Sequence, residues 1–250
     1  MSADTRFNHL TFDSFKRFSK DDTLSCYEKI GFPDDYRRNK EQAIFQDYLL
    51  KLSNLNKRNQ TIIEIGPGCS ELPRMLIDLC EKNDNHLILI DSQEMLDLLP
   101  DKPFIKKIAS FYPNECIGIL SQYQTKIDVI VAYSVMQYIF VEANIFNFLD
   151  FSISLLADGG QMLIGDIPNA SKRKRFLSST NGIRHHQEHY EPQGIPTVKN
   201  FVIEHKNIDD AVIFSMLSRC RLAGFDAYIM PQAEELPMAN RREDILIVKP

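Results

Sequence analysis

The stretch Ile62-Ile63-Glu64-Ile65-Gly66-Pro67-Gly68-Cys69-Ser70-Glu71 decides the fold of this chain. It predicts a buried, β-branched strand that ends in a glycine-cornered turn and leads into a helix. Glycine at positions 66 and 68 lets the backbone turn sharply and approach a ligand with no Cβ in the way. The helix that follows offers free backbone N–H groups at its start. Turns of this kind usually hold nucleotide-like ligands, and the question is which one.

Strand and helix signals alternate from this turn onward. Fully apolar short strands separated by helices imply a parallel sheet that is covered on both faces. We therefore expect an α/β fold: a doubly wound, mostly parallel, Rossmann-like sheet of seven strands whose last strand is antiparallel. The expected strands span 61–65, 86–91, 103–108, 126–133, 161–167, 224–230 and 243–250. The expected helices span 70–81, 92–98, 113–122, 141–157 and 209–222.

Two segments interrupt this rhythm. Residues 1–55 are polar with interspersed aromatic side chains and end in an amphipathic helix over 36–52, so they form a helical N-terminal segment. Residues 56–250 form the sheet domain. Within it, residues 168–208 are basic, contain histidines and are rich in glycine, proline and asparagine. A long insertion of this kind is usually functional.

Bulk composition excludes several classes of function. A net charge of −5 and a pI near 5.7 make nucleic acid an unlikely partner. No apolar run reaches the roughly 18 residues that a membrane-spanning helix needs, and the N-terminus has no signal-peptide pattern. The five cysteines are scattered without C-x-x-C spacing. Reduced thiols of this kind indicate a cytoplasmic protein.

The residues around the turn narrow the ligand class. A P-loop needs a lysine after its last glycine, and none is present. The third position of a dinucleotide motif is Glu71, whose carboxylate would repel a pyrophosphate, so a nicotinamide cofactor is the second choice. Asp91 ends the next strand, where a carboxylate can accept both hydroxyls of a ribose. A cationic or zwitterionic nucleoside fits these residues best.

The pattern Glu64-x-Gly66-x-Gly68-x-Ser70 resembles the first motif of class I S-adenosylmethionine-dependent methyltransferases, with serine where a third glycine often stands. The resemblance implies S-adenosylmethionine as cofactor, S-adenosylhomocysteine as product and an N-terminal helical cap over residues 1–55. It also implies a set of cofactor-binding residues, which follow the turn and the carboxyl ends of the strands. They are Arg37 (or its neighbour Arg38), Glu64, Gly66, Gly68, Asp91, Ser92, Ala109, Ser110, Tyr133 and Ser134.

The candidate base for deprotonating an acceptor hydroxyl is one of the histidines in the insertion, His185, His186 or His189, because a pKa near 6.5 suits proton transfer at neutral pH. Asp166, after the fifth strand, is a further candidate for contacting the acceptor. No metal is expected. His185 and His189 share a helix face but lack a third ligand, and Tyr133 and Ser134 stand where metal-dependent methyltransferases carry an acid.

The sequence thus predicts a methyltransferase for a small-molecule acceptor. A resemblance to methyltransferases of surface-polysaccharide or secondary-metabolite pathways favours a sugar hydroxyl. The basic run 172–175 is either a solvated helix start or a site for an anionic acceptor such as a nucleotide-linked or acidic sugar. Two alternatives stay open: a non-catalytic methyltransferase-like subunit and, less favoured, a nicotinamide-dependent oxidoreductase. A homodimer is also left open.

Overall fold

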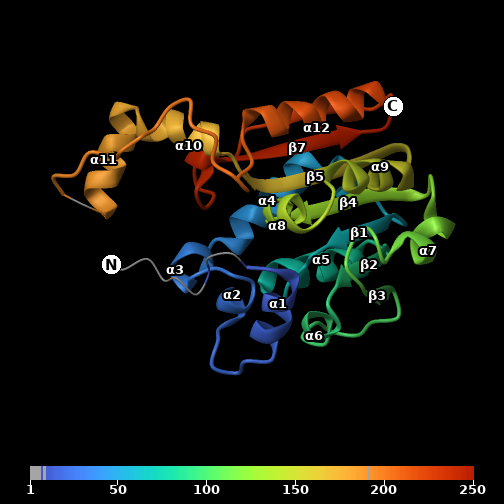
Figure 1. The fold of residues 1–250 in the computed structure, drawn as a ribbon. Helices are drawn as coiled ribbons and strands as arrows, with labels where there is room; N and C mark the ends of the chain where they lie inside the picture. Colours follow the sequence, from blue (N-terminus) through green and yellow to red (C-terminus); the bar gives the residue numbers. More distant parts are fainter. Residues whose placement is uncertain (1–6, 8–9, 191) are drawn as a thin grey trace.

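Seven strands form one sheet in the computed structural model, which describes residues 7, 10–190 and 192–250. The strand order is β3-β2-β1-β4-β5-β7-β6 (Figure 1). Strands β1 to β5 run parallel, whereas β7 is antiparallel to both of its neighbours, β5 and β6. The predicted fold class is therefore confirmed. The strands are β1 (Thr61–Ile65), β2 (His86–Asp91), β3 (Ile105–Ala109), β4 (Ile127–Tyr133), β5 (Leu156–Pro168), β6 (Asp226–Met230) and β7 (Arg242–Val248).

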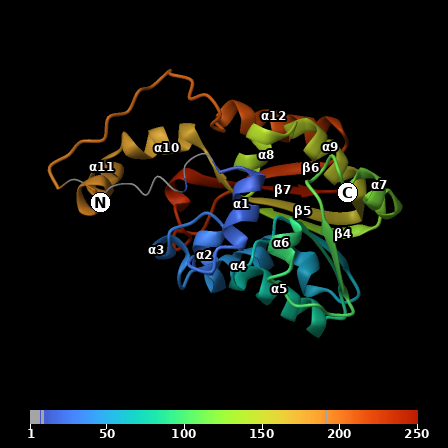
Figure 2. The same ribbon diagram turned by 60° about the horizontal axis from the view of Figure 1, so that its bottom comes forward.

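Helices cover both faces of the sheet (Figure 2). The α-helices up to β4 are α1 (Phe12–Ser19), α2 (Cys26–Lys29), α3 (Asp34–Arg37), α4 (Glu41–Lys51), α5 (Glu71–Lys82), α6 (Gln93–Leu96) and α7 (Ile117–Leu120). Those that follow are α8 (Met136–Glu142), α9 (Ile145–Leu155), α10 (Ala170–Leu177), α11 (Thr180–His189) and α12 (Asp210–Leu222). Short 3-10 helices are η2 (Ser53–Asn56), η3 (Ser121–Tyr123) and η4 (Ala239–Arg241).

The period of two in the strands explains the two layers of core. In β1, Ile62 packs with the side chains of α4 and α5, whereas Ile63 and Ile65 pack with those of α8, α9 and α12. Every second residue of a strand faces the same side of a sheet, so a wholly apolar strand feeds both cores. Because Ile44 and Tyr48 of α4 are fully buried in the first of these cores, α4 belongs to the framework of the sheet domain.

Some predicted boundaries differ from the structure. The helix expected over 141–157 is two helices, because the Asn144 side chain accepts hydrogen bonds from the N–H groups of Phe146 and Asn147 and starts α9 anew. Strand β5 already begins at Leu156, which pairs with Ile127. Asp158, Gly159 and Gly160, which fall between the expected helix and the expected strand, therefore lie inside β5. The insertion over 168–208 holds α10 and α11, which begin after the side-chain caps Asn169 and Ser179.

The site region lies where the chain changes direction. From β1 the chain moves to β2 and β3 on one side, and it then returns to β4 on the other side of β1. Helices on opposite faces leave a crevice outside the carboxyl ends of the strands at such a switch point. Among the described residues, no helix is long and apolar enough to cross a membrane.

A buried charge network ties α4 to β7. Lys51 Nζ lies 2.6 Å from a carboxylate oxygen of Asp47 and 2.6 Å from one of Asp244. All three side chains are almost completely buried. Removing one member of such a network leaves an uncompensated buried charge.

Lys51→Met should therefore lower the free energy of unfolding by about 3–5 kcal/mol, because two buried carboxylates lose their cation. Denaturant unfolding monitored by circular dichroism measures this. The matched control is Lys102→Met, which breaks the exposed pair with Glu81 and should cost at most about 0.5 kcal/mol. Equal effects of the two substitutions would contradict the role assigned to the network.

Candidate functional site

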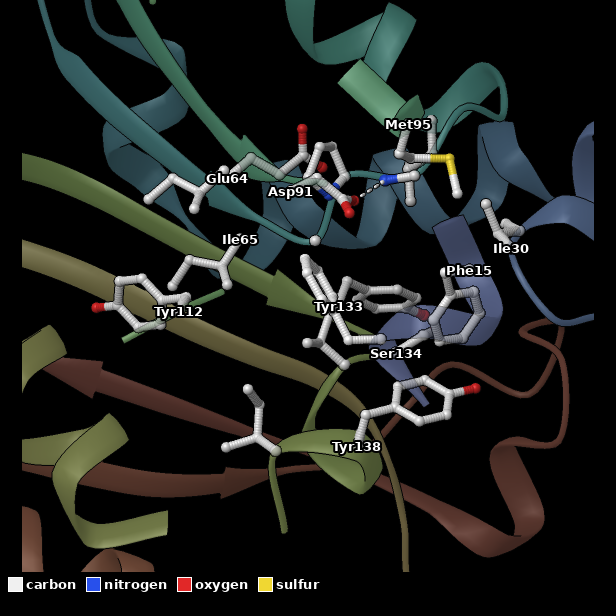
Figure 3. A pocket seen from close by; sticks show the side chains of 18 of the residues that line it. Phe15, Ile30, Glu64, Ile65, Asp91, Met95, Tyr112, Tyr133, Ser134 and Tyr138 are labelled. Atoms are coloured by element: carbon white, nitrogen blue, oxygen red, sulfur yellow. Dashed lines mark hydrogen bonds between the residues drawn. The ribbon is translucent and has the colours of Figure 1, made fainter. Parts of the chain in front are cut away.

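A cavity lies outside the carboxyl ends of β1, β2 and β4. Its volume is about 920 Å³, which includes the open solvent at its mouth. In the close view of Figure 3, Asp91 and Tyr138 lie on opposite sides of it, with Tyr133 and Ser134 between them. Most of the predicted cofactor residues line this cavity. They are Arg37, Glu64, Gly66, Gly68, Asp91, Ser110, Tyr133 and Ser134.

Both glycines of the turn are required by their backbone conformation. Gly66 has a φ of +65° and Gly68 a φ of +67°, a region that side chains with a Cβ rarely adopt. Space is limiting as well. A Cβ on Gly66 would lie 2.8 Å from Val135, and a Cβ on Gly68 would lie 2.6 Å from Ile30. The turn is thus in close contact with Val135, which follows β4, and with Ile30, which follows α2.

Asp91 holds the turn from the end of β2. Its Oδ2 accepts a hydrogen bond from the N–H of Gly68 at 3.3 Å, and its Oδ1 accepts one from the N–H of Ser92 at 2.7 Å. Burial raises the pKa of Asp91 to about 6, although both hydrogen bonds favour the charged form. Each carboxylate oxygen keeps a further acceptor site, so a ligand with paired hydroxyls can bind here.

Glu64 is the second buried carboxyl beside the turn. Only 3% of its surface is exposed, and its Oε2 is buried without a hydrogen-bond partner among the described residues. Burial and the neighbouring carboxylate of Asp91 raise the pKa of Glu64 to about 8. An unpaired acid at the wall of a cavity offers an acceptor to a cationic ligand.

A chain of polar side chains closes the other end of the cavity. Arg37, at the end of α3, donates a hydrogen bond to the Ser134 hydroxyl, which donates to Asp166 Oδ2 at 2.5 Å. The guanidinium carbon of Arg37 lies 4.4 Å from the centre of the Phe32 ring and 5.5 Å from that of Tyr133. Of the two candidate arginines, Arg37 faces the cavity, whereas Arg38 is exposed and paired with Asp34.

Aromatic side chains of the N-terminal helices line the cavity, and the sequence analysis did not assign them a role. Phe12 contacts Phe111 with ring centres 5.2 Å apart, and Phe15 contacts Tyr138 at 4.9 Å. All four line the cavity. The available signal was the spacing of Phe12 and Phe15, which puts them on one face of a helix.

Two predicted cofactor residues are not part of the cavity wall. Ala109 ends β3 with an exposed side chain, because its neighbour Ile108 points into the core and successive residues of a strand point to opposite faces. Ser92 is buried and caps α6 by accepting the N–H of Met95. Ser92 nevertheless touches the site through its own N–H, which Asp91 accepts.

The three candidate histidines lie on α11, which extends away from the sheet in both ribbon views (Figures 1 and 2). None of them lines the cavity. His185 Nε2 lies 3.5 Å from Arg241 Nη2, and burial, His189 and Arg241 lower the pKa of His185. Burial and a hydrogen bond with Tyr190 raise the pKa of Tyr36, so the end of α11 meets α3. The catalytic role of the histidines stays a prediction.

The described residues contain no group of three or more histidine, cysteine, aspartate or glutamate side chains that could hold a metal ion. Within the same residues, the five cysteines are free thiols. The polar side chains that line the cavity carry carboxyls, hydroxyls and the buried guanidinium of Arg37.

Solved methyltransferase structures share this fold. The plantazolicin methyltransferase BpumL, solved with a desmethylPZN analog and SAH, is 14% identical over 95% of this chain and 97% of its own, with a TM-score of 0.57. A SAM-dependent methyltransferase from Aquifex aeolicus is 11% identical, with 90% and 97% covered and a TM-score of 0.53. The CurJ carbon methyltransferase is 14% identical, with 90% and 61% covered and a TM-score of 0.56.

No protein-family model and no curated protein matches the sequence. The identities to the solved structures are low, and what the likeness establishes is the fold. This chain has the Rossmann-like fold of the class I methyltransferases, with the strand order and the antiparallel β7 described above.

The raised pKa of Glu64 makes stability depend on pH. Between its usual value of 4.5 and about 8, the folded protein holds the proton that the unfolded chain releases, so this group lowers stability as pH rises through that window. Glu64→Gln removes the titration. Relative to wild type, the variant should gain about 3–4 kcal/mol of unfolding free energy between about pH 5 and about pH 8.

Urea unfolding of both proteins across this pH range measures the difference. The matched control is Glu81→Gln, which changes an exposed acid paired with Lys102. Its difference from wild type should stay flat within about 0.5 kcal/mol. A flat profile for Glu64→Gln as well would show that Glu64 ionises freely in the folded state.

Proposed function

We propose that this protein is an S-adenosylmethionine-dependent methyltransferase that acts on a small-molecule acceptor. The observation that carries the proposal is the pair of buried carboxyls, Glu64 and Asp91, beside a turn of two positive-φ glycines. These acids disfavour a pyrophosphate and favour a ligand with a ribose and a positive charge. The common fold with solved methyltransferases supports the same conclusion.

The residues of the cavity fit the parts of S-adenosylmethionine. Asp91 would accept the two ribose hydroxyls, and Glu64, with its unpartnered oxygen, would face the positive charge of the ligand. Arg37 would bind the carboxylate of the methionine moiety. Ser110 and Phe111, which follow β3 and line the cavity, would contact the adenine. When bound, the sulfonium supplies an activated methyl group.

The task left to the protein is to orient the acceptor and to take up its proton. Glu64 and Asp91 are assigned to the cofactor, and Asp166 is a further carboxyl that is linked to the cavity, because Ser134 lines it and donates to Asp166. We therefore propose Asp166 as the base for an acceptor hydroxyl, and the histidines of α11 as the second choice. A sugar hydroxyl is the acceptor that the sequence resemblance favours. The transfer requires no metal in this proposal, so a chelator should leave it intact.

Calorimetric titration with S-adenosylmethionine, S-adenosylhomocysteine and NADH tests the cofactor. Both sulfur ligands should bind in the micromolar range and NADH should not bind. Asp91→Ala should weaken the binding of S-adenosylmethionine at least about tenfold, which corresponds to about 1.4 kcal/mol, because the ribose loses its acceptor.

The control is Asp97→Ala, an exposed acid of the same segment that does not line the cavity, and its affinity should equal that of wild type. NADH binding alone would support the oxidoreductase. No binding of any ligand would favour the non-catalytic subunit.

Transfer of a radiolabelled methyl group from S-adenosylmethionine to the small-molecule fraction of a cell extract tests the base. Asp166→Asn should reduce the rate about 10²-fold or more, because the proton acceptor is lost. It removes a charge beside Arg37 and Arg242, but its amide oxygen can still accept from Ser134, which binds Arg37, so cofactor affinity should stay within about threefold. The comparison is His185→Gln, His186→Gln and His189→Gln, measured singly. If one histidine variant loses turnover while Asp166→Asn keeps it, the base lies on α11.

A further inference from the structure

A second pocket lies at the start of the insertion, between the end of β5 and the start of β7. Three arginines line it, and no acidic residue does. The remaining lining residues are small, amide or apolar: Pro168, Asn169, Ala170, Asn207 and Ile208. A concave surface with converging guanidinium groups recognises oxyanions, because each group presents several N–H donors in a plane.

The backbone at this pocket is already satisfied. Asn169 caps α10 by accepting the N–H groups of Ser171 and Lys172, and the N–H of Ala170 donates to the carbonyl of Ile208 at 2.8 Å. The start of the helix therefore has few donors left for a ligand. Any affinity for an anion comes from the arginine side chains.

The three guanidinium groups retain binding capacity. Arg242 Nη1 donates to the carbonyl of Asp166 at 3.2 Å, while its buried Nε has no hydrogen-bond partner among the described residues. Arg173 pairs with Glu204 at 2.6 Å. Arg241 donates through Nε to the side chain of Asn240, and within the described part of the chain no carboxylate pairs with it. Arg173 and Arg242 each lie near one carboxylate, Glu204 and Asp166, and the amide of Asn169 binds Asp210 and Glu243. Arg241 is therefore the guanidinium of this pocket whose charge no carboxylate of the described residues balances.

The basic run 172–175, suspected from the sequence, plays a different part. Lys174 and Arg175 pair with Glu204 and Asp210, and Lys172 Nζ donates to the carbonyl of Arg242 at 2.6 Å. The contacts of Lys172 and Arg175 fix the insertion to the sheet domain, whereas that of Lys174 lies within the insertion. Arg173 alone of this run lines the pocket, and the other two arginines come from the far end of the chain, just before and at the start of β7.

Asp166 links the pocket and the cofactor cavity through its contacts, although it lines neither. Arg242 Nε lies 3.6 Å from Asp166 Oδ1, while Asp166 Oδ2 accepts the hydrogen bond of Ser134, which lines the cavity. A single carboxylate therefore contacts a residue of each. A molecule that places an oxyanion on the arginines would lie beside the group to which the proton of the acceptor is assigned.

We propose that the pocket lined by Arg173, Arg241 and Arg242 is an anion-binding subsite that takes the phosphate or carboxylate group of the methyl acceptor. The anion-binding part stands on this pocket alone. The link to the acceptor rests on the proposed methyltransferase function. If this link holds, the substrate class narrows from small molecules in general to acidic small molecules.

Calorimetric titration of the full chain with sodium phosphate, at constant ionic strength, tests the subsite, and sodium acetate provides the carboxylate arm. Wild type should bind at least one of the two anions at one site. Arg241→Gln should weaken that binding at least about tenfold, because the arginine without a carboxylate partner is lost. The arm with the tighter binding identifies the group.

The matched control is Arg219→Gln, which removes an exposed arginine paired with Asp150 and should leave the affinity unchanged. Absence of binding in wild type, or equal weakening in both variants, would overturn the subsite. Thermal unfolding of each variant, measured without anion, separates lost binding from lost folding.

Repeating the phosphate or acetate titration with saturating S-adenosylhomocysteine tests the link to the acceptor. Both ligands must fit together, so the affinity for the anion should stay within about twofold. Mutual exclusion would overturn the acceptor assignment. If S-adenosylhomocysteine fails to bind while the anion binds in an Arg241-dependent way, the proposed function fails and the anion site stands.

Discussion

The position of Asp166 depends on its contact with the carboxylate of Asp244. Asp244 Oδ1 accepts the N–H of Asp166 at 2.8 Å and the amide of Gln232 at 2.9 Å, and its Oδ2 accepts Lys51 Nζ at 2.6 Å. Asp166 has a φ of +56°, at a register shift in the pairing of β5 with β7. Its N–H would be an unpaired buried donor there without Asp244. The antiparallel insertion of β7 beside β5 supplies that acceptor, so the topology of the last strands determines where the carboxyl of Asp166 points.

On the opposite side of the cavity, two acidic side chains are buried at a cost in free energy. Glu64 and Asp91 lie beside each other at the strand ends, and both have a raised pKa because burial disfavours their charged forms. Natural proteins retain such unfavourable groups where a ligand can compensate them. A cationic ligand would stabilise both carboxylates at once, so affinity and specificity for such a ligand arise from the same two residues. The glycines at 66 and 68 let it approach.

Much of this arrangement could be predicted from the sequence, because it depends on local patterns. Apolar strands, the two glycines and an acid at the end of the second strand are each readable over a few residues, and the sheet places them together. Ala109 is assigned to the site through the resemblance alone; its side chain is exposed and does not line the cavity, and its role stays a prediction. Phe12, Phe15 and Arg241 reach their positions through tertiary contacts with segments far away in the sequence. No periodicity within a segment encodes such contacts.

The two pockets have opposite electrostatic character, and Asp166 lies between them. Carboxyls line the side of the cavity near the glycine turn, whereas arginines line the second pocket.

In the proposed reaction, the methyl group leaves a positively charged sulfur and a neutral thioether remains. The product therefore lacks the positive charge of the sulfonium that the two carboxyls stabilise. They bind the product less strongly than the cofactor. On the other side, arginines that hold an anion keep the acceptor in place while Asp166 takes up the proton. Acidic groups on one side of Asp166 and arginines on the other thus favour binding of the two reactants and release of the product.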